Sequence, residues 1–150
     1  SWDTAFKPDQ VNDYSVCTVW LTKPDKRYFL LNVIKDRMDF PTLLKTAEST
    51  WRSHEVDIMI IEDKGSGTSL IQTLKQQSIH ATAYLPKQDK ITRLYTQISA
   101  IERGQVYLPK EAPWLADFMT EILAFPNSSH DDQVDSVAQF LDWAEKKLHL

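Results

Sequence analysis

The stretch that decides the fold is IMIIEDKGSGTSLIQ, residues 58–72. Four apolar residues lead into two carboxylates, Glu62 and Asp63, then into a Gly-Ser-Gly turn and an apolar spacing typical of a helix. The pattern predicts a buried strand over 56–61, a tight turn and a helix over 68–77. Sites in α/β sheets lie beyond the carboxyl ends of strands, so we expect these two acids near a functional site.

The glycines of this turn are notable because the whole chain has only three. Gly65 and Gly67 allow a tight backbone path, and Ser66 or Thr68 is expected to cap the following helix. Ordinary turn chemistry explains the glycines equally well. The turn is not a phosphate-binding loop, because it matches neither G-x-x-x-x-G-K-[ST] nor G-x-G-x-x-G.

Two strands are visible near the start of the chain. Residues 16–21 (VCTVWL) and 28–34 (YFLLNVI) are rich in β-branched and aromatic residues, and a polar turn separates them. We expect an antiparallel hairpin, with the first residues adding a third strand that carries Asp3. Further elements are predicted as helices over 40–53, 89–103, 113–123 and 130–148, a strand over 79–85 and an extended piece over 105–109. This order predicts an α/β fold with a mixed central β-sheet and helices on both faces.

Length and composition predict a single domain over residues 1–150. The chain opens at Ser1 without a methionine, so we expect a piece of a longer protein. No apolar run reaches the roughly 18 residues that cross a bilayer, so no membrane association is expected. The single Cys17 excludes a disulfide framework and is typical of a reducing compartment such as the cytoplasm.

The net charge of −4 argues against a stand-alone nucleic-acid-binding module, which is usually basic. It argues less against an enzyme whose carboxylates hold divalent cations, because bound cations invert the local charge.

One group of acids opens the last predicted helix. The segment HDDQVD supplies Asp131, Asp132 and Asp135, and the spacing puts either of the first two on one helix face with the third. Acids in a first helical turn also complement the helix dipole, which accounts for Asp131 on its own. His130 is a candidate metal ligand or proton shuttle, or simply a neighbour of the helix start.

Two other acids come from distant segments. Asp3 lies on the first strand and Glu62 follows a central strand. Combined with the late acids, they predict a cluster of oxygen ligands for two Mg²⁺ or Mn²⁺ ions. One ion would activate water and the other would stabilise the leaving oxygen in phosphodiester cleavage.

Basic residues near these acids are candidates for contact with the phosphates of a nucleic acid. Lys87, Lys90 and Arg93 follow the strand predicted to end at residue 85, where they would contact phosphate or form a solvated helix face. Lys64 would contact the scissile phosphate or neutralise the neighbouring acids. Lys7 is a weaker candidate.

Four segments together resemble the C-terminal nuclease domain of tailed-phage terminase large subunits, the DNA-packaging motor. They are SWDTAFK, IIEDKGSGTSLIQ, LPKQDKITR and HDDQVDS, which occur in the order seen in that family and cover nearly the whole chain. The resemblance implies an RNase H-like fold and a two-metal endonuclease that cuts concatemeric viral DNA. It implies double-stranded DNA as substrate and the host bacterial cytoplasm as location.

The resemblance also assigns the acids. It implies Asp3 as the first metal ligand and Glu62 as the second, with the third among the late acids in the order Asp132, Asp135, Asp131. The catalytic set is therefore Asp3, Glu62 and Asp132.

The ATPase half of such proteins is not in this sequence, which has no Walker A motif. The terminase small subunit and the portal protein are the partners expected of a full-length protein. Two alternatives stay open: another RNase H-like nuclease, such as a junction resolvase or transposase core, and a non-catalytic module that docks onto motor proteins.

Overall fold

The computed structural model describes residues 1–6 and 13–148, so Lys7 lies outside the described residues. These residues form a six-stranded mixed sheet in the order β5-β4-β1-β2-β3-β6. The strands are β1 (Trp2–Asp3), β2 (Ser15–Thr22), β3 (Tyr28–Asp36), β4 (Ile60–Glu62), β5 (Thr82–Tyr84) and β6 (Val106–Tyr107). The helices are α1 (Phe40–Ser53), α2 (Ser66–Gln76), α3 (Lys90–Glu102), α4 (Leu115–Ala124) and α5 (Asp132–Lys147).

The sheet combines an antiparallel meander with parallel strands. β1 pairs antiparallel with β2, and β2 with β3, which confirms the predicted three-stranded start. β1 also pairs in parallel with β4, β4 with β5, and β3 with β6. The parallel pairs have their carboxyl ends at one edge, so β1 and β4 both end there.

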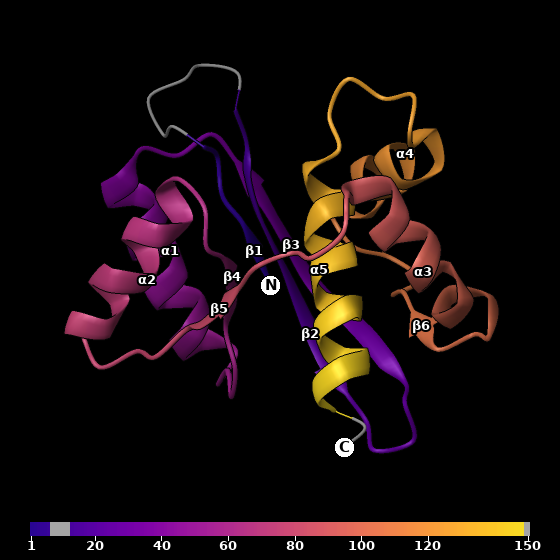
Figure 1. The fold of residues 1–150 in the computed structure, drawn as a ribbon, viewed down its shortest axis with the longest axis horizontal. Coiled ribbons are helices and arrows are strands. Elements are labelled where there is room, and N and C mark those ends of the chain that lie inside the picture. Colours follow the sequence, from indigo (N-terminus) through magenta and orange to yellow (C-terminus); the bar gives the residue numbers. More distant parts are fainter. Residues whose placement is uncertain (7–12, 149–150) are drawn as a thin grey trace.

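Helices cover both faces of the sheet, as predicted (Figure 1). α1 and α2 pack on one face around a core that includes Trp2, Leu43 and Leu70. α4 and α5 pack on the other face around Val16, Phe140 and neighbouring apolar side chains. The sheet therefore separates two apolar cores.

The ends of the elements follow local signals in part. Asp39 caps α1, where its carboxylate accepts from the backbone N–H of Thr42 at 2.9 Å, and Pro41 stands in the first turn. The predicted strand over 56–61 is wrong at its start, because β4 begins only at Ile60. Pairing decides this boundary, since Ile60 is the first residue of β4 with a partner on β5.

Side-chain hydrogen bonds hold β1 against α5. The amide Nε2 of Gln139 donates to the backbone oxygen of Trp2 at 3.0 Å. The hydroxyl of Ser136 donates to the backbone oxygen of Ser1 at 2.8 Å, and the hydroxyls of Ser136 and Thr18 lie 2.7 Å apart. The last helix is therefore fixed to the two-residue strand that carries Asp3.

Candidate active site

The Gly-Ser-Gly turn packs tightly against the segment that follows β1 and against the end of β4. Gly65 has a φ of +57°, and a Cβ placed on it would lie 2.7 Å from the backbone oxygen of Phe6. A Cβ on Gly67 would lie only 2.1 Å from the backbone oxygen of Glu62. Both glycines are therefore required by close backbone approach, which turn chemistry alone does not demand.

The predicted side-chain caps of α2 are wrong. The N-cap residue is Gly65. The Ser66 hydroxyl instead donates to the backbone oxygen of Ala5, and the Thr68 hydroxyl donates to Oδ1 of Asp63 at 2.7 Å. These hydroxyls tie the turn to the segment after β1 and to Asp63, so they are not available to cap the helix.

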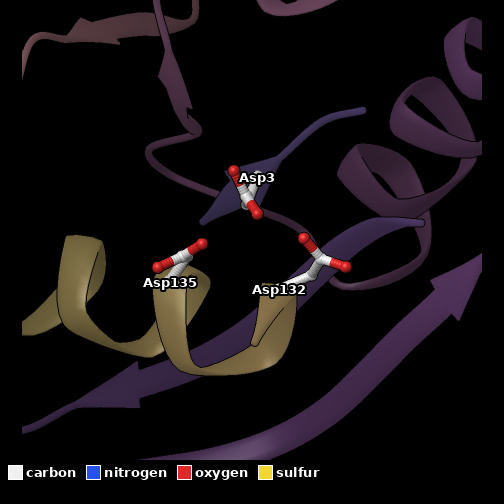
Figure 2. Close-up of side chains that lie close together, drawn as sticks. All are labelled: Asp3, Asp132 and Asp135. Carbon is white, nitrogen blue, oxygen red and sulfur yellow. The ribbon is translucent and has the colours of Figure 1, made fainter. Parts of the chain in front are cut away.

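The acids from three segments meet at the edge where β1 and β4 end. The register pairs Trp2 with Ile61, so the next residues, Asp3 and Glu62, lie side by side on neighbouring parallel strands. Asp132 and Asp135 lie on the first turn of α5 and point toward Asp3 (Figure 2). One carboxylate oxygen from each of Asp3, Asp132 and Asp135 lies within 4.8 Å of the others.

Burial and mutual repulsion raise the pKa values of this cluster. Asp3 is 9 % exposed, and burial, followed by the charges of Asp135, Asp132 and Glu62, raises its pKa well above the usual value. Burial and the charge of Asp131 raise the pKa of Asp132 to about 6. Burial raises the pKa of Asp135 to about 7, although Lys90 opposes the shift. Such a cluster stores repulsion that protons or a cation would relieve.

Asp131 and Glu62 stand beside this trio in different ways. Asp131 is the N-cap residue of α5, and its side chain makes no capping bond among the described residues. Its Oδ2 instead accepts from Nζ of Lys90 at 2.7 Å. Glu62 is half-buried, and its charge and hydrogen bonding add to the effects of burial, Asp135 and Asp132 that raise the pKa of Asp3. The structure therefore groups Asp132 and Asp135, rather than Asp131, with Asp3.

The acids line a cavity of about 480 Å³ together with several basic side chains. Lys64, Lys90 and Arg93 line this cavity, whereas Lys87 is exposed and is not among its lining residues. Arg93 is 9 % exposed, and its Nε meets no acceptor among the described residues. Of the predicted basic residues in the described chain, three thus line the same cavity as the acids.

Sequence reasoning missed Glu121, a buried carboxylate on α4. Its Oε2 accepts from the backbone N–H of Val134 at 2.9 Å, and its Oε1 accepts from Nε2 of Gln133 at 2.9 Å. Glu121 therefore supplies the N-terminal cap that Asp131 does not. The available signal was a carboxylate inside the apolar run FMTEILAF.

Tyr14 was missed as well. It lines the acid cavity, and its ring lies 4.8 Å from Nζ of Lys35 and 4.6 Å from Cζ of Arg37. The ring of His130 packs edge-on against it, with centroids 5.4 Å apart. His130 is exposed and does not belong to the lining of the cavity, and its suggested part in chemistry stays a prediction.

Fold and site together define an α/β domain with a cavity, lined by carboxylates, where β1 and β4 end. The chain belongs to the family described as the terminase RNaseH-like domain, whose model matches residues 1–143. This match confirms the predicted family and the RNase H-like fold, and it identifies a terminase domain of the nuclease type. A comparison with curated proteins found no match. Among the described residues, no helix is long and apolar enough to cross a membrane.

Proposed function

We propose that this domain is a metal-dependent DNA endonuclease that cuts concatemeric viral DNA during genome packaging. The observation that carries the proposal is the convergence of Asp3, Asp132 and Asp135 within 4.8 Å in a cavity of a terminase RNaseH-like domain. In the full-length protein, we infer that a separate ATPase part drives translocation, and that the small subunit and the portal are its partners in the host cytoplasm.

The donor set fits Mg²⁺ or Mn²⁺, because the three side chains that come together, Asp3, Asp132 and Asp135, all offer carboxylate oxygens. Oδ1 of Asp135 is buried and meets no partner among the described residues, so it is free to accept a cation. We infer that Asp3, Asp132 and Asp135 would hold the metal, and that Glu62 would add a further carboxylate beside them. When bound, the two ions supply an activated water and stabilise the leaving oxygen of the phosphodiester.

The cations of the cavity support DNA as the substrate. Arg93 has a buried Nε without an acceptor among the described residues, and a guanidinium is well suited to a phosphate oxygen. Lys64 is exposed and lines the same cavity, and it directly precedes the glycine turn. We infer that both hold backbone phosphates, and that the exposed Lys87 adds a weaker contact outside the cavity. Such contacts position the duplex without reading its sequence.

A plasmid-cleavage assay tests the proposal. Supercoiled DNA would be incubated with the domain in Mg²⁺, Mn²⁺ or EDTA, and with the variants Asp3→Asn, Glu62→Gln and Asp132→Asn. We expect nicking that requires metal and is lost in all three variants. The control is Asp57→Asn, which removes an exposed carboxylate before β4 and is expected to cut like wild type.

Two outcomes count against the proposal. If the three variants nick at the wild-type rate, the cluster is not the site of cleavage. If the folded wild-type domain does not cut with either metal, the domain is not a nuclease by itself. Binding to motor proteins in that case would favour a docking module.

A further inference from the structure

Lys90 occupies an unusual position for a residue expected to contact DNA. It is the first residue of α3, whose N-terminus is capped by Asp89 through the backbone N–H of Thr92 at 2.9 Å. Its Nζ lies 2.7 Å from Oδ2 of Asp131 and 3.0 Å from Oδ2 of Asp135. Its side chain is 36 % exposed, so the ammonium is partly withdrawn from water. The ammonium thus lies against Asp131 and Asp135, on one side of the acid cluster.

The two carboxylate oxygens of Asp135 have different surroundings. Its Oδ2 is the atom that pairs with Lys90, and its Oδ1 is buried without a partner among the described residues. The same carboxylate belongs to the trio whose oxygens lie within 4.8 Å of one another. A divalent ion held by that trio would therefore share Asp135 with the ammonium.

We propose that Lys90 is a built-in competitor of the metal: its ammonium occupies the Asp131–Asp135 side of the cluster and weakens the binding of a divalent cation at Asp3, Asp132 and Asp135. This inference rests on the metal site of the proposed function, but not on DNA cleavage. A doubly charged ion beside the ammonium is repelled by it, and the two cations draw on one carboxylate.

The coupling must act in both directions. If Lys90 lowers the affinity for the metal by some factor, a bound metal loosens the Lys90 pair by the same factor. The lysine would then hold the metal-free cavity together and be released from Asp135 when the metal enters. Two independent measurements follow from this reciprocity.

The first measurement is a calorimetric titration of MnCl₂, without DNA, into wild type, Lys90→Met, Lys90→Arg and Lys87→Met. Lys87→Met removes an equal charge from an exposed residue outside the cavity lining, so it controls for net charge. We expect Lys90→Met to bind Mn²⁺ on the order of tenfold more tightly, within the usual range of coupling between sites. Lys90→Arg and Lys87→Met should stay close to wild type. Equal or weaker binding by Lys90→Met would overturn the proposal.

The second measurement needs no variant and therefore does not depend on the folding of Lys90→Met. Wild-type protein is labelled with a limiting amine-acylating reagent, with and without Mg²⁺, and modification of each lysine is followed by mass spectrometry. We expect Mg²⁺ to accelerate labelling of Lys90 and to leave Lys87 unchanged. Unchanged or slower labelling of Lys90 would contradict release by the metal.

The outcomes separate this inference from the proposed function. Tighter Mn²⁺ binding by Lys90→Met in a domain that never cuts DNA would support the competitor and refute the nuclease. Cutting that depends on metal, with Mn²⁺ affinities indifferent to Lys90, would do the reverse. If neither wild type nor Lys90→Met binds Mn²⁺, both proposals fail.

Discussion

Gly67→Ala should damage both the fold and the site through a single methyl group. The new Cβ would lie 2.1 Å from the backbone oxygen of Glu62 and 3.2 Å from Oγ1 of Thr4, whereas ordinary contact begins at 3.4 Å. The first of these contacts is with backbone, so the end of β4 or the start of α2 must move by about 1 Å. Glu62 is therefore displaced relative to Asp3.

The expected cost combines two opposing effects. Overpacking of this kind costs roughly 1–3 kcal/mol, and a backbone clash belongs at the upper end of that range. Replacing glycine by alanine inside a helix returns about 1 kcal/mol. We therefore expect Gly67→Ala to lower the free energy of unfolding by about 2 kcal/mol, which lowers Tm by roughly 4–8 °C for a domain of this size. A displacement of about 1 Å in the site would also slow cleavage about 100-fold.

Urea unfolding and plasmid cleavage, measured on the same preparations, would check this prediction. The matched control is Gly104→Ala, because Gly104 has a φ of +71° but a Cβ there would meet nothing within 4 Å. Its backbone strain should cost about 1–2 kcal/mol and leave cleavage unchanged. If Gly67→Ala cuts as fast as Gly104→Ala, the close approach at Gly67 does not position Glu62, and the reasoning is wrong.

Three further predictions address the cluster and its supports. The raised pKa values of Asp132 (about 6) and Asp135 (about 7) mean that the folded state holds extra protons, so the metal-free domain should lose stability as pH rises from about 4 to 7. Thermal melts at pH 5 and pH 8 would show this as a fall in Tm, and the fall should be smaller in an Asp132→Asn/Asp135→Asn variant. An equal fall in that variant would mean that these two aspartates do not cause the pH dependence. Glu121→Ala should lower the free energy of unfolding, measured with urea, by about 1.5–3 kcal/mol, because the backbone N–H of Val134 loses a charged acceptor. A loss no larger than that of Glu121→Gln would argue against a charged cap. Leu70→Ala should lower the free energy of unfolding by about 2–5 kcal/mol, because this fully buried residue lies in the core beneath α1 and α2. The Mn²⁺ affinity of the folded protein should stay unchanged, and a changed affinity would mean that core and site are coupled.

Local sequence patterns predicted the elements that carry the site. The apolar run before Glu62 and the glycines after it predicted a strand, turn and helix, and the structure contains all three. Two segments rich in β-branched and aromatic residues, separated by a polar turn, predicted the hairpin of β2 and β3. These predictions succeeded because the information lies within a few residues of each element.

Contacts between distant segments set what the sequence left open. The spacing of the late acids allowed either Asp131 or Asp132 to join Asp135, and Lys90, 41 residues before Asp131, pairs with Asp131. The caps predicted for α2 were wrong because Ser66 bonds to Ala5, 61 residues away. A single sequence carries no local signal for such pairings.

The attachment of β1 to α5 determines when, during synthesis of the chain, the acid cluster can form. The bond from Gln139 to the backbone of Trp2 joins residues 137 positions apart, and the first and last acids meet through the same pairing of elements. Contacts of such long sequence separation form late, since the chain between them must be ordered first. A ribosome-bound chain that has not yet released α5 therefore carries Asp3 and Glu62 without their partners. The acid cluster is therefore completed only when synthesis of the domain is nearly finished.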